Sequence, residues 1–191
     1  MKKTALVFLL SACLCGCGTP MVVKQLSTEQ VKTQATLEQS LKNYFAIIEK
    51  LVANQVVASN YLIDQATNGI IEKRKQQALK ALDTANAADR ERILDELSQQ
   101  TKAELETAAA NKAEIKLRVE KLQTKHKELL EAYAAIRAAQ EKLDAYIQLE
   151  KADEAVLNEV IGIVGINRQK AEKATDDIAV LTERLSSLLG R

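Results

Sequence analysis

Three cysteines and a single histidine are the residues of this chain best suited to chemistry. Cys13, Cys15 and Cys17 alternate with other residues, and His126 lies more than a hundred positions away. Thiolate and imidazole groups bind zinc, and paired thiols form disulfides or redox pairs. A zinc site needs four ligands, however, and the sequence offers no histidine or further cysteine near these three. Cysteines separated by one residue are also too close for easy disulfide geometry.

The residues around the cysteines predict a different use for them. Met1-Lys2-Lys3 is a short basic lead, and an uncharged apolar run follows from Ala5 to Leu14. A basic lead, an apolar run of roughly 7–15 residues and small residues at a cut site are typical of a secretory signal. The run is too short to cross a bilayer as a helix, which takes about 20 residues.

Residues 1–18 resemble the signal sequence of a bacterial lipoprotein precursor. The lipobox of that family has a Leu three residues before a Cys and a small residue just ahead of it, and both "LCGC" and "LSAC" fit. The resemblance implies that diacylglycerol is attached to the Cys sulfur, that the chain is cut before this Cys, and that the new N-terminus is acylated. The first register leaves ten apolar residues and favours Cys17, whereas the second leaves six and makes Cys13 the alternative.

The resemblance also implies domain limits and a location. It implies a signal peptide over 1–16 and a lipidated cysteine at position 17. The rest of the sequence predicts a short tether, which completes the segment 17–26, and one helical coiled-coil domain over 27–191. Gly18, rather than Asp, follows Cys17, which in Gram-negative members of the family implies the inner leaflet of the outer membrane, facing the periplasm. A Gram-positive source would place the protein on the outside of the cell membrane.

The composition predicts an all-α protein. Ala, Leu, Glu, Lys and Gln dominate, with one Pro, no Trp, four Tyr and two Phe, and these abundant residues favour helix. Without Lys2 and Lys3, the remaining 25 basic and 26 acidic residues give a net charge of −1. Such a balance gives no electrostatic reason to bind nucleic acid.

The first predicted helix runs from Ser27 to Leu82. Ser27 and Gln30 match a capping box at its start. Apolar residues then alternate by four and three along a heptad seam, with Gln55 as its polar member: Leu37, Leu41, Tyr44, Ile48, Leu51, Gln55, Ala58 and Leu62. Asn68-Gly69 lies within this stretch and would make a fourth helix if it were a turn.

Two further helices follow, after predicted turns at 83–88 and 150–153. The second opens near Asp89, and Asp153 is a candidate cap for the third. The second seam is Ile115, Val119, Leu122, His126, Leu129, Tyr133, Ile136, Gln140, Leu143 and Ile147. The third is Leu157, Val160, Val164, Asn167, Ala171, Ala174, Ile178, Leu181, Leu185 and Leu188. These seams predict an elongated antiparallel coiled coil or bundle of three long helices, or of four if Asn68-Gly69 is a turn.

No catalytic residues, metal ligands or cofactors are predicted within the helices. His126 falls on a seam, where a single polar residue typically fixes the register of neighbouring helices. Gly162 and Gly165 are unusual among branched apolar residues. They predict a close helix–helix approach or a loop, with a partner contact or a hinge as the alternative.

The expected function is that of a membrane-anchored lipoprotein with no enzymatic activity. It would be a structural or adaptor component of a cell-envelope assembly of the secretion, efflux or conjugation type. The alternative is a periplasmic inhibitor or immunity-type lipoprotein that binds one protein. Expected partners are the membrane, through the lipid, and proteins, through helical surfaces, with homo-oligomers as a further option.

Overall fold

A computed structural model describes residues 19–189, and every regular element in that range is a helix. These are α2 (Met21–Leu82), α3 (Ala87–Gln148) and α4 (Glu154–Leu189), and no strand occurs between residues 19 and 189. The all-α prediction of long helices is confirmed. Asn68-Gly69 lies inside α2, so the described chain has three helices and not four. Cys13 and Cys17 lie outside the described residues, and their roles stay predictions.

Helix α2 starts six residues earlier than predicted. The carbonyl of Pro20 accepts hydrogen bonds from the backbone N–H of Val23 (2.9 Å) and Lys24 (3.3 Å). Proline suits this place because its fixed φ is compatible with a helix and it has no N–H to leave unpaired. The predicted capping box at Ser27 is therefore wrong, since that residue lies in the second turn of a continuous helix.

The turn between α2 and α3 is shorter than predicted and occupies residues 83–86. The side-chain Oδ1 of Asn86 accepts a hydrogen bond from the backbone N–H of Asp89 at 3.0 Å. Asn is among the best N-cap residues because its side chain pairs with one of the free N–H groups of the first turn. Helix α3 accordingly begins at Ala87, two residues before the predicted start.

The break between α3 and α4 was predicted correctly, and the helix ends on both sides of it are capped. Glu150 has a φ of 56°, and the N–H of Lys151 donates to the carbonyl of Tyr146 at 2.9 Å. A left-handed residue followed by such a bond is a Schellman ending. The Oδ1 of Asp153 then accepts the N–H of Val156 at 2.9 Å, which confirms Asp153 as the cap of α4.

Contacts divide the described chain into two units that share α2, α3 and α4. Unit 1 contains residues 19–47 and 124–179, and unit 2 contains residues 48–123 and 180–189.

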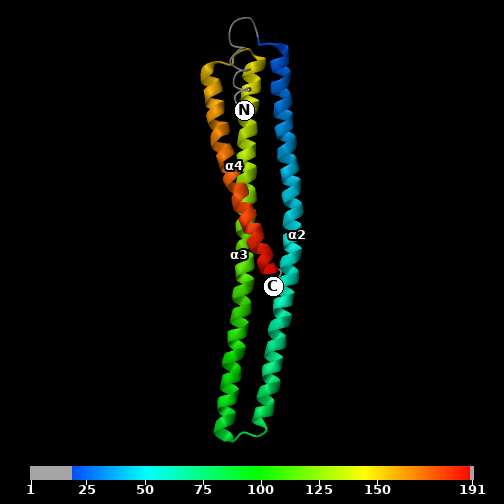
Figure 1. The fold of residues 1–191 in the computed structure, drawn as a ribbon, viewed down its shortest axis with the longest axis vertical. Coiled ribbons are helices and arrows are strands. Elements are labelled where there is room, and N and C mark those ends of the chain that lie inside the picture. The colour runs from blue at the N-terminus through cyan, green and yellow to red at the C-terminus, as the bar shows by residue number, and fades with distance from the viewer. Residues whose placement is uncertain (1–18, 190–191) are drawn as a thin grey trace. The chain divides into compact units, whose positions relative to one another are not determined.

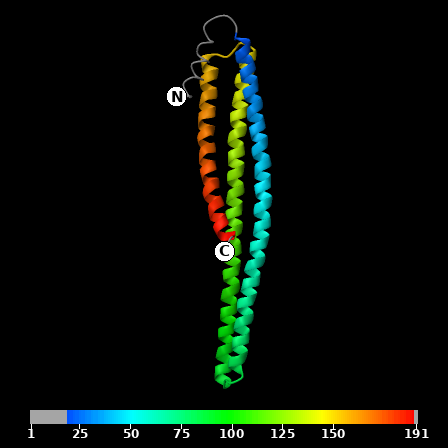
Figure 2. The same ribbon diagram turned by 45° about the vertical axis from the view of Figure 1, so that its right-hand side comes forward.

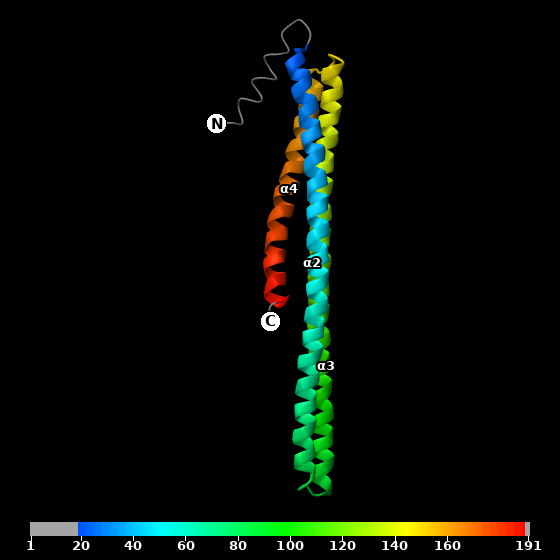
Figure 3. The same cartoon turned by 90° about the vertical axis from the view of Figure 1, so that its right-hand side faces the viewer.

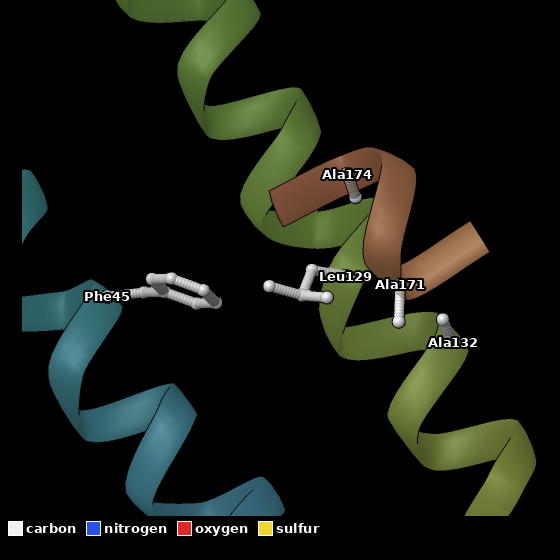
Figure 4. Packing of buried hydrophobic residues seen from close by; sticks show 5 residues of the cluster. All are labelled: Phe45, Leu129, Ala132, Ala171 and Ala174. Carbon is white, nitrogen blue, oxygen red and sulfur yellow. The ribbon is translucent and has the colours of Figure 1, made fainter. Parts of the chain in front are cut away.

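In unit 1, α3 lies between α2 and α4 (Figures 1 and 2). Phe45 of α2 reaches Leu129 of α3, and the small side chains Ala171 and Ala174 of α4 pack on the same part of α3, beside Ala132 (Figure 4). Alanine on both helices permits a close approach of their backbones.

Ion pairs link the helices of unit 1. Lys142 of α3 meets Glu159 of α4 at 2.7 Å, and Lys125 of α3 meets Asp177 of α4 at 3.2 Å. Hydrogen-bonded carboxylates raise the pKa of both lysines above the ordinary value: Glu128 and then Asp177 act on Lys125, and Glu159 acts on Lys142.

Unit 2 is a helical hairpin for most of its length, with α2 and α3 side by side down to the turn at 83–86 (Figure 3). The last turns of α4 reach it near Ser59, whose hydroxyl donates to the carbonyl of Leu189 at 3.4 Å. Beyond that point only Thr67 and Ile71 of α2 and Ala108 of α3 are buried before Ile115. The hairpin core is therefore thin, with Ile71 as the one large apolar side chain buried in this stretch.

The seams predicted for α3 and α4 are confirmed, because every member is buried or half-buried. The seam predicted for α2 is mostly wrong. Leu41 and Ile48 are half-buried as expected, but the other members are exposed: Leu37, Tyr44, Leu51, Gln55, Ala58 and Leu62. The face of α2 that packs against its neighbours instead carries Glu38, Phe45, Val52, Val56, Ser59 and Ile63.

Candidate functional site

Unit 1 carries a groove on its surface. It consists of two adjoining hollows of about 490 and 310 Å³ that share Gln140, Val164 and Arg168. Helices α2 and α4 form its walls and α3 forms its floor. We call it the α2–α4 groove, and its lining is Ser27, Gln30, Gln34, Leu37, Tyr133, Ile136, Gln140, Leu143, Leu157, Val160, Ile161, Val164, Gly165, Arg168, Ala171, Glu172, Thr175 and Asp176.

Two amide side chains of the groove carry oxygens without a partner. The Oε1 atoms of Gln34, on α2, and Gln140, on α3, are buried and accept no hydrogen bond from the described residues. A buried acceptor that is left unpaired costs about 1–3 kcal/mol. A donor in the groove could reach these two oxygens only after the amide side chains turn toward it.

A charged cluster beside the groove ties α2 to α3. Glu38 is buried, lies 2.6 Å from Lys42 Nζ, and has its Oε2 2.9 Å from Arg137 Nε. The Arg137 N–H does not point along that short line, so the contact is an ion pair and not an aligned hydrogen bond. Lys42, and then Arg137, hold the pKa of the Glu38 carboxyl below its usual range, although burial acts in the opposite direction.

His126 lies on the α3 seam, as predicted. It is 3% exposed and stacks on Phe45, with ring centroids 4.0 Å apart and planes inclined by 9°. This stack joins α3 to α2 within unit 1. Across residues 19–189, no group of three or more His, Cys, Asp or Glu side chains could hold a metal ion.

The predicted close approach at Gly162 and Gly165 is wrong. Both residues lie inside α4, so neither marks a loop. A Cβ atom added to either would have no other atom within 4 Å apart from its own helix backbone and neighbours, so no helix packs closely there. Gly165 instead lines the α2–α4 groove.

The other polar residues predicted on seams do not pair across helices. Gln55 is exposed, because it lies on the misassigned α2 stripe. Asn167 is half-buried and donates to the carbonyl of Ile163 in its own helix at 2.8 Å. Gln140 lies in the floor of the groove. Glu38 and Arg137 were not singled out from the sequence, and only the correct α2 register would have placed Glu38 inside.

Comparison with known proteins does not assign the chain to a family. No family model matches the chain, and no curated protein or solved structure is significantly similar to it. Of the three described helices, none has an apolar stretch sufficient to cross a membrane.

Proposed function

We propose that the protein is a lipid-anchored structural or adaptor component of a cell-envelope assembly, which binds a protein partner through the α2–α4 groove. The observation that carries the proposal is this groove, which is lined by apolar side chains of α3 and α4 and by the polar α2 residues Ser27, Gln30 and Gln34. An amphipathic partner helix has the matching chemistry, because its apolar side chains would fill the groove and its polar side chains would lie against the polar α2 wall. The lipobox-like "LCGC" supports the anchor.

The anchor is tested by metabolic labelling with a fatty acid. Cys17→Ala is expected to abolish labelling and leave an uncut precursor, while Cys13→Ala and Cys15→Ala stay labelled. If the Cys17→Ala variant were still labelled and had the size of the mature protein, Cys17 would not be the lipidated residue. If only Cys13→Ala lost the label, Cys13 would be the lipidated residue.

The groove is tested with a photo-crosslinking residue in place of Leu37, which lines it. We expect a cross-link to an envelope protein in the membrane fraction, and Gly165→Leu should abolish it by filling the groove. Gly162→Leu is the matched control, because Gly162 lies three residues away in α4 without lining the groove. An unchanged cross-link in Gly165→Leu would contradict groove binding.

A periplasmic inhibitor or immunity-type lipoprotein is the second candidate. The same groove supports it, since a concave surface of this size suits the capture of a single partner. A cross-linked partner that is a toxin or a soluble enzyme would support this candidate over the adaptor.

A further inference from the structure

Exposed apolar side chains gather at the end of unit 1 where α2 begins. Met21, Val22 and Leu26 of the first turns of α2 are 60–73% exposed, and Leu149, just after α3, is 65% exposed. The end of α3 lies beside the start of α2, because Gln148 Nε2 donates to the carbonyl of Lys24 at 3.1 Å. Figures 1 and 3 show these two helix ends together with the start of α4. We call these four residues the end patch.

One pair of opposite charges lies beside the end patch. Lys24 forms an ion pair with Glu150 at 2.8 Å, and its ammonium also donates to the carbonyl of Gln148 at 3.3 Å. Single exposed apolar residues are normal on protein surfaces, whereas a group of large ones at one place indicates contact with a partner or a membrane.

The chain outside the described residues indicates what this end faces. Helix α2 starts at Met21, so only residues 18–20 separate it from Cys17. Three residues span at most about 11 Å. If Cys17 carries the lipid, the end patch is held next to the bilayer surface.

We propose that the end patch docks on the lipid bilayer, with Met21, Val22, Leu26 and Leu149 in the boundary between headgroups and acyl chains. This proposal rests on the lipid anchor of the proposed function. Apolar side chains at that depth gain by leaving water. The near-neutral charge of the chain predicts docking on zwitterionic lipid without a requirement for anionic lipid.

The absence of tryptophan from the sequence makes a clean test available. The lipidated full chain carrying Leu149→Trp is reconstituted into phosphatidylcholine vesicles with or without brominated acyl chains. We expect a blue-shifted emission and at least twofold quenching by the brominated lipid, with the same result for Leu26→Trp. Ile47→Trp is the control, because Ile47 is 58% exposed on the same unit but 26 residues further along α2, about 39 Å of helix. The emission of Ile47→Trp should neither shift to the blue nor be quenched by the brominated lipid.

The outcomes separate docking from anchoring. Protein that floats with the vesicles while Leu149→Trp and Leu26→Trp stay unquenched overturns docking and leaves the anchor standing. Protein that does not float overturns both. A blue shift without vesicles that disappears on dilution would show that a second copy covers the end patch, which also overturns the proposal.

Discussion

At the scale of residues, the neighbours Tyr44 and Phe45 show how α2 is oriented. Tyr44 is 58% exposed, whereas Phe45 is 5% exposed and lies between His126 and Leu129 of α3. The two aromatic rings differ little in size, so their different surroundings, and not their chemistry, should decide what each contributes.

Phe45→Ala is expected to lower the free energy of unfolding by about 3 kcal/mol, because it removes a buried ring and leaves a cavity against α3. Tyr44→Ala should change it by less than about 0.5 kcal/mol, since the ring faces solvent. Urea unfolding followed by circular dichroism measures both. Equal losses would mean that α2 does not pack in this register.

Glu38→Gln is expected to lower the free energy of unfolding at pH 7 by about 1–2 kcal/mol, because Arg137 loses the carboxylate that compensates it. The folded-state pKa of Glu38 lies below the ordinary value of a free Glu, chiefly because of Lys42 and then Arg137. Its stabilisation is therefore complete above that value and is lost as the pH falls through the folded-state pKa.

The difference between wild type and Glu38→Gln should consequently shrink between pH 7 and pH 3 in the same unfolding experiment. Glu29→Gln serves as the control, because Glu29 pairs with Lys32 at the surface and its loss should be nearly neutral. A difference that is independent of pH would rule out the ionised Glu38 as its source.

At the scale of elements, the sequence identifies α3 and α4 better than α2. In α3 and α4, one stripe of apolar or small residues stands out from polar neighbours, so spacing alone finds the buried face. In α2, two stripes compete, one through Tyr44 and Leu51 and the other through Phe45 and Val52. No local sequence feature shows which of the two stripes is buried. Packing against α3 and α4 determines which one it is.

The α2–α4 groove could not be predicted for a related reason. Gln34, Gln140 and Gly165 are brought together only by the packing of three helices, and each resembles an ordinary surface residue in its own segment. The helix ends at Asn86 and Asp153, in contrast, depend on neighbours within three residues, so sequence reasoning came close at the first and was correct at the second.

Gly162→Ala and Gly165→Ala are each expected to raise the free energy of unfolding by up to about 1 kcal/mol. Alanine is the better helix former, and the added Cβ meets no other atom. Thermal or urea melts of the single and double variants measure the effect, with Gly69→Ala in α2 as a further open position. A loss of stability in either α4 variant would reveal packing on that face.

At the scale of the whole molecule, stability should be uneven. The hairpin of unit 2 buries few large side chains between residues 63 and 112, whereas the parts of α2, α3 and α4 in unit 1 share a core around Phe45 and Leu129. Amide exchange reports such local differences in opening free energy.

Hydrogen exchange followed by mass spectrometry should therefore show faster exchange in peptides from 63–82 and 87–112 than in peptides from 124–147 at the same pH. All three stretches are helical, so secondary structure itself does not explain the expected difference. Uniform protection along α3 would contradict it.

The short turn at 83–86 has a consequence for the order of folding. Across the hairpin, Arg74 meets Glu104 over 30 residues, whereas Thr28 meets Asp144 over 116 residues. Closing the longer loop costs roughly 1 kcal/mol more in chain entropy, and the first half of α2 must wait until α3 has been synthesised. We expect pairing of α2 with α3 to begin at this turn and to propagate away from it. The least stable part of the chain would then be the first to form. The later formation of the unit 1 core would stabilise the pairing of α2 with α3 that began at the turn.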